Sequence, residues 1–325
     1  MVFALFRVNH VHPDPTDQQV MSDRYRAVIE LAKYADKGGF AAISTEEHHS
    51  TSMGWSPTPL TTATAILTNT DNVMVTISAL LVPLHDPDRL AEDIAVIDLL
   101  SRGRLTTVTG LGYRPVEYAA HGKEWKRRGK LLDEALDVMM KAWTGEPFEH
   151  NGEMIQVRPM PWSRPHPPIF IGGSSPAAAM RAARLGLPFQ LPGPSPEIEE
   201  LYASECERHG TSPFAIVPDG TVMLHVAEDP DRVWAEHGEC FMLEAQTYKS
   251  WQPEGQSSAV KSGATSIDEL RAEGIYQVLT PDEAIALGRE KGILSLHPLV
   301  GGMPIDEAWS SLELTVDKVI PALIQ

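Results

Sequence analysis

Two carboxylates and two histidines stand together in the run Thr45-Glu46-Glu47-His48-His49, directly after a short apolar stretch. Histidine changes its charge near neutral pH, so it can both accept and donate a proton there. A metal site is disfavoured, because neighbours in an extended chain point in opposite directions and HExxH is absent. The alternative from the residues alone is that these are solvated loop side chains, or that one of them caps a neighbour.

Two glycines in the segment Thr109-Gly110-Leu111-Gly112-Tyr113-Arg114-Pro115 allow the backbone to approach a flat ligand closely. A tight turn between a strand and a helix explains the same glycines equally well. The segment Ser78-Ala79 also follows apolar residues, and taken alone it indicates a buried strand.

A possible anion site lies in Gly172-Gly173-Ser174-Ser175-Pro176. Proline favours the first helical position and serine is a good N-cap, so this run predicts the start of a helix. Backbone N–H groups, a serine hydroxyl and the positive helix end together suit a cofactor phosphate. The basic run of Arg127, Arg128 and Lys130 reads mostly as a solvated surface, although one of its cations could reach that phosphate.

The composition excludes several function classes. A formal charge of −17 makes nucleic acid and membrane surfaces poor partners. Cys206 and Cys240 form no zinc or disulfide pattern and are interpreted as inert packing or surface residues. The chain carries no GxSxG, Walker A or serine-triad signature. With no long apolar window and no signal-peptide pattern, we expect a cytoplasmic protein.

Short apolar runs alternate with longer amphipathic segments along the whole chain, which predicts a single α/β domain over residues 1–325. Strands are expected at 3–8, 40–44, 73–82, 105–109, 169–171, 189–191, 221–227 and 293–296. Helices are expected at 21–35, 60–67, 90–100, 131–143, 176–185, 197–209, from about 230, and at 305–319. Because no GxGxxG follows the first strand, a closed (β/α)8 TIM barrel is favoured over an open doubly wound sheet.

Two segments interrupt this alternation. Asn151-Gly152 within residues 148–157 predicts an inserted β-hairpin outside the barrel. Residues 246–274 show little periodicity, so they are expected to be a disordered segment or a lid-like loop that covers the site when substrate binds. In a barrel, the active site lies at the carboxyl ends of the strands. The segments 45–49, 109–115 and 172–176 each follow a predicted strand, which places these three at that end.

Taken in order, the motifs resemble the bacterial-luciferase-like flavin-dependent monooxygenase family. The resemblance is close over about residues 1–190 and looser towards the end of the chain, and it does not include 246–274. It rests on Glu47-His48-His49, residues 90–93 with 100–105, Gly110-Leu111-Gly112-Tyr113-Arg114-Pro115, residues 168–174, and His297-Pro298-Leu299-Val300-Gly301-Gly302.

The resemblance implies a role for each candidate residue. His48 corresponds to the catalytic histidine, and Ser78-Ala79 to a non-prolyl cis peptide beside the flavin ring. Ser175, with Gly173 and Ser174, corresponds to the FMN phosphate site, assisted by Arg128 or Lys130. Gly110 and Gly112 correspond to a loop that lies close to the flavin. Leu111 departs from luciferase, which carries an arginine there, so phosphate binding is expected to depend more on the other groups.

The implied reaction is monooxygenation of a small organic substrate by reduced FMN and O2 through a flavin peroxide. It also implies a flavin reductase as supplier of the reduced cofactor, and a homodimer. One alternative is a deazaflavin-dependent hydride-transfer oxidoreductase on the same barrel. Another is a non-catalytic flavin-binding subunit, against which the presence of His48 argues.

Overall fold

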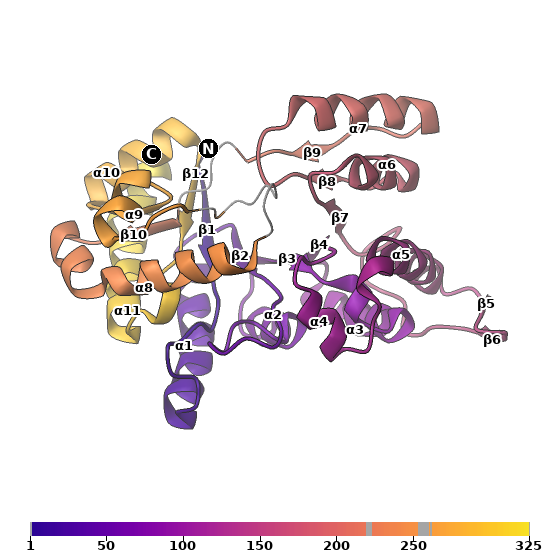
Figure 1. Cartoon of the computed structure of the whole chain (residues 1–325), viewed down its shortest axis with the longest axis horizontal. Helices are drawn as coiled ribbons and strands as arrows, with labels where there is room; N and C mark the ends of the chain where they lie inside the picture. Colours follow the sequence, from indigo (N-terminus) through magenta and orange to yellow (C-terminus); the bar gives the residue numbers. More distant parts are fainter. Residues whose placement is uncertain (1, 219–222, 253–259, 261, 325) are drawn as a thin grey trace. The chain divides into compact units, whose positions relative to one another are not determined.

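The computed structural model describes residues 2–218, 223–252, 260 and 262–324. The chain divides into two compact units (Figure 1). Unit 1 comprises Met1–Pro57, Asn69–Val75 and Gly220–Gln325, and unit 2 comprises Thr58–Thr68 and Thr76–Asp219. The expectation of a single domain over residues 1–325 stays a prediction.

Unit 1 is built on five parallel strands whose order is β11-β10-β12-β1-β2. Strand β12 therefore lies between β10 and β1, although β11 precedes it in the sequence. The first strand pairs with a strand near the end of the chain, and Phe3 is opposite Ile293. The bounds are β1 (Phe3–Arg7), β2 (Ala42–Thr45), β10 (Met223–Val226), β11 (Tyr276–Leu279) and β12 (Ile293–Leu296).

The helices of unit 1 are α1 (Gln18–Lys37), α8 (Pro230–Trp251), α9 (Ile267–Glu273), α10 (Pro281–Lys291), α11 (Ile305–Leu314) and α12 (Ile320–Ile324). Helix α8 is the longest of these, and Asp229 caps it by accepting a hydrogen bond from the N–H of Arg232. The apolar face of α8 belongs to a buried cluster that includes residues of β10 and β11.

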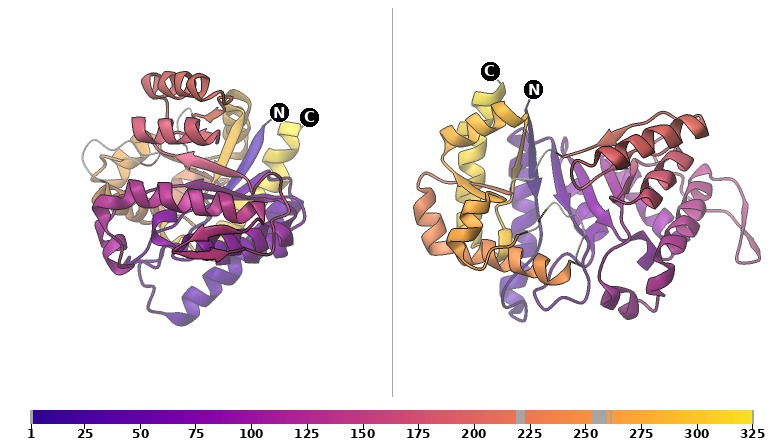
Figure 2. Two further views of the ribbon diagram at one scale, coloured as in Figure 1. Left: turned by 90° about the vertical axis from the view of Figure 1, so that its right-hand side faces the viewer. Right: turned by 45° about the horizontal axis from the view of Figure 1, so that its top comes forward.

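Unit 2 contains the continuation of β3 (Met74–Leu80) and the parallel strands β4, β7, β8 and β9, in the order β3-β4-β7-β8-β9. Their bounds are β4 (Leu105–Thr109), β7 (Ile169–Gly172), β8 (Phe189–Gln190) and β9 (Ala215–Ile216). The helices are α2 (Pro59–Thr68), α3 (Pro87–Ser101), α4 (Pro115–Ala120), α5 (Arg128–Thr144), α6 (Pro176–Leu185) and α7 (Pro196–His209). Helices α6 and α7 lie side by side (Figure 2).

A separate two-stranded antiparallel sheet joins β5 (Phe148–His150) to β6 (Glu153–Ile155) through Asn151-Gly152. Both turn residues have positive φ, 52° and 83°, as a two-residue hairpin turn of type I′ requires. No helix among the described residues is long and apolar enough to cross a membrane.

Each of the eight predicted strand positions holds a strand, so the α/β class with a parallel sheet is confirmed. The count was wrong, because β9 and β11 bring the described parallel strands to ten. Both are short, and the sequence pattern predicts no strand at either position. Closure of the sheet into a TIM barrel stays a prediction.

The expectation for 246–274 was also wrong in its described parts. Helix α8 continues to Trp251, and Ile267–Glu273 forms α9. Ser266 caps α9 by accepting from the N–H of Glu269, and Gly274 ends it with a φ of 72°. The rest of the predicted lid lies mainly at 253–259 and 261, outside the described residues.

Candidate active site

His48 lies in the loop after β2 in unit 1 and is almost fully buried. Three aromatic rings surround its imidazole. The ring centroids lie 5.7 Å from Trp55, 6.0 Å from Tyr248 and 5.0 Å from Trp251. The backbone N–H of His48 donates to the carbonyl of Ser56 at 3.1 Å, which fixes the loop that carries both His48 and Trp55.

His49 has different surroundings from its neighbour. One nitrogen of its half-buried ring lies 2.8 Å from Oε1 of Glu47. The two histidines therefore differ in partners, as the alternation of an extended segment predicts. Three aromatic rings lie around the imidazole of His48, and the ring of His49 lies beside Glu47.

A buried ion pair holds two of the rings around His48. Oε1 of Glu46 accepts from the indole N–H of Trp55 at 2.9 Å, and Oε2 lies 3.6 Å from Nε of Arg7. The guanidinium of Arg7 in turn donates to the hydroxyl of Tyr248 at 2.7 Å. Arg7 is the last residue of β1 and Glu46 follows β2, so neighbouring strand ends orient Trp55 and Tyr248.

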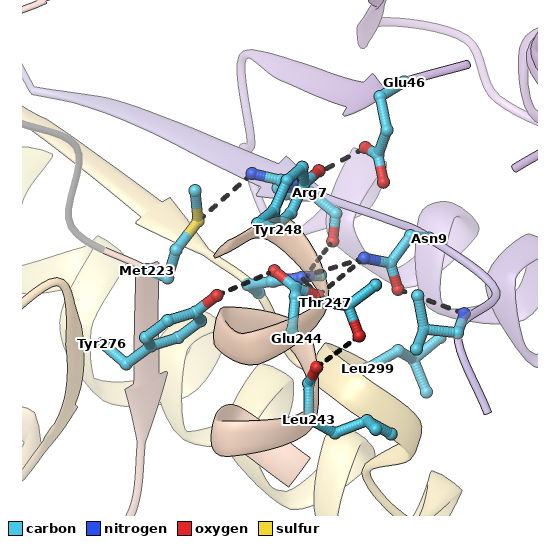
Figure 3. A network of polar contacts seen from close by, with 12 residues as sticks. Arg7, Asn9, Glu46, Met223, Leu243, Glu244, Thr247, Tyr248, Tyr276 and Leu299 are labelled. Atoms are coloured by element: carbon cyan, nitrogen blue, oxygen red, sulfur yellow. Dashed lines mark hydrogen bonds and ion pairs between the residues drawn. The ribbon is translucent and has the colours of Figure 1, made fainter. Parts of the chain in front are cut away.

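A second buried group continues this network (Figure 3). Oε2 of Glu244 on α8 lies 3.0 Å from Nε2 of His297 and accepts from the amide of Asn9 at 2.8 Å. The hydroxyl of Tyr276 donates to Oε1 at 3.2 Å. Burial works to raise the pKa of Glu244, but His297, Arg7 and Asn9 together lower it to about 2, so this carboxylate is ionised.

Sequence reasoning identified His48 but missed Arg7, Trp55, Glu244, Tyr248 and Trp251. For α8, a signal was present: Glu244, Tyr248 and Trp251 recur at i, i+4 and i+7, which places them on one face of a helix. The spacing ends inside residues 246–274, a segment that otherwise shows little periodicity, so it does not stand out in the sequence.

The candidate cofactor residues lie in unit 2. The peptide bond between Ser78 and Ala79 is cis, which confirms the geometry that the resemblance implies. Ser78 accepts a hydrogen bond from the amide of Gln190 at 3.3 Å. Gly110 follows β4 and approaches this segment so closely that a Cβ on it would lie 2.6 Å from the Cβ of Ala79.

The end of β4 has two further features of a ligand cradle. Gly112 adopts a φ of 68°, and a Cβ there would lie 3.3 Å from the Leu81 side chain. The buried hydroxyl of Thr109 has no hydrogen-bond partner among the described residues. A buried polar atom without a partner indicates a missing ligand or water.

Helix α6 starts as predicted. Ser175 is its N-cap and its hydroxyl accepts from the N–H of Ala178 at 3.3 Å, with Pro176 in the first helical position. The N–H of Gly173 donates to the carbonyl of Gln190 at 3.1 Å and is used by the sheet, while the predicted place of Gly173 at the phosphate stays a prediction. The N–H groups of Ser174 and Ser175 donate to no other described residue, and both serines are exposed.

The two candidate cations near this helix differ in their partners. Lys130 is exposed, and its amine lies 3.5 Å from Glu134 one turn along α5. The guanidinium of Arg128 instead lies over the ring of Trp125, 4.0 Å from its centroid, with no carboxylate partner among the described residues. The neighbouring carbonyl of Gly129 accepts from Arg181 of α6 at 3.3 Å, so the start of α5 lies beside α6.

Among the described residues, no group of three or more histidine, cysteine, aspartate or glutamate side chains could hold a metal ion. The polar cluster around His48 in unit 1 and the glycine- and serine-lined segments of unit 2 are two candidate functional regions, one in each unit.

Residues 1–284 match the family model described as luciferase-like monooxygenase. The chain belongs to this family. A luciferase-like relative, the oxygenase component of a flavin-dependent trigonelline monooxygenase from Acinetobacter baylyi, is 31% identical over 353 residues, which is 99% of this chain and 95% of the relative. The protein is accordingly a luciferase-like flavin-dependent monooxygenase.

Solved structures of luciferase-like proteins agree with the fold. Monooxygenase RslO1 from Streptomyces bottropensis superimposes with a TM-score of 0.76 at 26% identity, over 99% of both chains. The oxygenating constituent of 3,6-diketocamphane monooxygenase from Pseudomonas putida, solved with FMN, gives a TM-score of 0.73 at 20% identity, again over 99% of both chains. At that identity the second match supports the fold alone.

Proposed function

We propose that this luciferase-like protein uses reduced FMN and O2 to oxygenate a small organic substrate, with His48 as the acid/base. The observation that carries the proposal is the burial of His48 at the end of β2 within three aromatic rings. An enclosed imidazole is shielded from water and can act as a positioned proton donor or acceptor.

Unit 2 supplies groups that suit FMN. The close approach of Gly110 to Ala79 suits a flat ring, and the Thr109 hydroxyl is available as a hydrogen-bonding group. For the phosphate we propose the hydroxyl of Ser175 and the N–H groups of Ser174 and Ser175, at the positive end of α6. Arg128 is favoured over Lys130, because the Lys130 amine already faces Glu134.

When bound, reduced FMN supplies the electrons that activate O2. The chain contributes binding, orientation and proton handling. His48 is positioned by its N–H bond to Ser56, while the rings of Trp55, Tyr248 and Trp251 exclude water around it. A positioned acid/base contributes a rate factor of roughly 10²–10⁴.

The test compares His48→Ala with the adjacent His49→Ala. Reduced FMN comes from an external flavin reductase, and product and hydrogen peroxide are followed together. Trigonelline is the first substrate to try, because the relative with matching length acts on it. We expect His48→Ala to bind FMN normally, to lose product by about 10²- to 10⁴-fold and to release hydrogen peroxide instead. Normal turnover in His48→Ala with loss in His49→Ala would move the assignment by one residue.

The alternatives separate in the same experiments. A deazaflavin-dependent oxidoreductase would bind the deazaflavin and not FMN, which an absorbance scan of cofactor-soaked protein distinguishes. A non-catalytic flavin-binding subunit would bind FMN without turnover by the isolated chain. A partner reductase, a homodimer and a cytoplasmic location accompany the proposal. Sedimentation and reductase-coupled turnover test the first two, and cell fractionation tests the third.

A further inference from the structure

Helix α8 carries an ionised carboxylate and two of the rings around His48 on the same face. Glu244, Tyr248 and Trp251 are spaced at i, i+4 and i+7, so they lie within about 60° of one another around the helix axis. Glu244 contacts Asn9, His297 and Tyr276 at the first of these three positions. The rings of Tyr248 and Trp251 reach His48 one and two turns further along. Whatever fixes Glu244 therefore fixes the placement of both rings.

Glu244 is fully buried where α8 packs against the apolar cluster of unit 1. A buried carboxylate destabilises a protein unless it is well paired, and an apolar side chain would pack there at less cost. Its partners come from separate strands: Asn9 follows β1, His297 follows β12, and Tyr276 belongs to β11. These three directional contacts define the rotation and the axial position of α8, which apolar packing alone defines poorly.

His297 and Asn9 both contact Oε2 of Glu244. Nδ1 of His297 lies 3.2 Å from the carbonyl of Arg7, which can only accept a hydrogen bond. Its Nε2 lies 3.0 Å from Oε2 of Glu244. The ionised carboxylate of Glu244 therefore accepts from Asn9 and faces His297 at the same oxygen. An amide at position 244 has nearly the same shape but carries no charge.

We propose that Glu244 is a positioning residue for His48. Its charge-assisted contacts with His297 and Asn9 hold α8 in the register that places Tyr248 and Trp251 against the imidazole. The catalytic consequence rests on the proposed function, whereas the placement of the rings does not. The experiment therefore has one readout that needs neither cofactor nor substrate.

That readout is the NMR spectrum of the histidine rings in the full chain. The signals of His48 are assigned by their loss in His48→Gln, and three aromatic rings at 5–6 Å shift them from their ordinary positions. In Glu244→Gln we expect these signals to move towards ordinary values. The matched control is Glu239→Gln, the same change at an exposed position of the same helix, which should leave them in place. Unchanged His48 signals in Glu244→Gln overturn the proposal.

Two milder variants keep the test decisive if Glu244→Gln does not fold. Glu244→Asp retains the charge but shortens the side chain, and Tyr276→Phe removes only the hydroxyl that donates to Oε1. Each should shift the His48 signals in the same direction by a smaller amount. If both fold and neither changes them, the proposal is wrong.

The activity arm separates this proposal from the proposed function. We expect Glu244→Gln to form product about 10- to 100-fold more slowly, with the difference released as hydrogen peroxide. The pH dependence of product formation should shift, whereas Glu239→Gln keeps both the rate and the profile of the natural protein. If Glu244→Gln shifts the His48 signals but the natural protein has no monooxygenase activity, the proposed function is contradicted and the positioning role stays intact. If the His48 signals shift in Glu244→Gln but the ratio of product to hydrogen peroxide and the pH profile are unchanged, the positioning role in catalysis is rejected.

Discussion

The imidazole of His10 stacks on the phenol ring of Tyr25, with the ring centroids 3.7 Å apart and the planes 20° from parallel. His10 follows β1 and is almost fully buried, and neither of its ring nitrogens has a hydrogen-bond partner among the described residues. Burial, and then the nearby guanidinium of Arg24, lower the pKa of His10 from 6.5 to about 3. The folded protein therefore keeps this ring neutral in mild acid.

This pKa shift predicts an acid sensitivity of stability. Below pH 6.5 the unfolded chain binds a proton at His10 that the folded chain does not bind until about pH 3. The stability linked to the neutral His10 ring is complete above pH 6.5. The free energy of unfolding falls as the pH drops from 6.5 to about 3. We expect His10→Gln to flatten the slope of unfolding free energy against pH between about 6 and 4. The decrease in slope should correspond to the uptake of close to one proton on unfolding. An unchanged slope in urea titrations across this range would show that His10 is not the group responsible.

Gly110→Ala tests the close approach between the ends of β3 and β4. The added methyl would lie 2.6 Å from the Cβ of Ala79, so one of the two segments must move. We expect a loss of about 1–3 kcal/mol in unfolding free energy. Adding Ala79→Gly should recover most of that loss, while Gly193→Ala, where nothing lies within 4 Å of the new atom, serves as the control. Thermal denaturation of the three variants and the natural protein measures this, and an unaffected Gly110→Ala contradicts the packing.

Ser175→Asp tests the proposed phosphate site without removing the cap of α6. Aspartate caps helices as well as serine, so the fold should persist. Its charge would face the phosphate and weaken FMN binding by more than about a hundredfold. Riboflavin, which lacks the phosphate, should bind the variant and the natural protein equally. Ser195→Asp at the start of α7 is the matched control, and equal FMN affinity in Ser175→Asp would place the phosphate elsewhere.

Arg128→Met and Lys130→Met separate the two candidate cations. The first removes a guanidinium that lies over Trp125, and the second removes an amine that lies near Glu134 on the exposed side of α5. We expect Arg128→Met to weaken FMN binding by roughly 10- to 100-fold, the range of a hydrogen bond to a charged group. Lys130→Met should bind FMN normally. Titration calorimetry in low and high salt measures both, and the reverse order of effects would assign Lys130.

Local patterns carried the successful predictions. The strand positions and the cap at Ser175 depend on residues close together in sequence. The network around His48 does not, because Arg7 and Tyr248 are 241 positions apart. Only the folded chain shows that Glu46 bonds the indole of Trp55 while also facing Arg7.

The proposed phosphate site also depends on a contact between residues that are distant in the sequence. Serine and proline at a helix start predicted the cap correctly, but the N–H of Gly173 is used by the carbonyl of Gln190 in the neighbouring strand. Which strand lies next to β7 decides that, and no local pattern reports it. The number of backbone donors left for an anion is therefore a property of the sheet.

The pairing of β1 with β12 has a consequence for synthesis on the ribosome. Residues 3–6 are hydrogen-bonded to residues 293–296, so one edge of β1 has no partner until almost the whole chain has been translated. Most of unit 2 is a continuous segment, Thr76–Asp219, and it leaves the exit tunnel well before β12. Vectorial synthesis thus favours folding of the segment 76–219 before the edge of β1 that faces β12 can be paired.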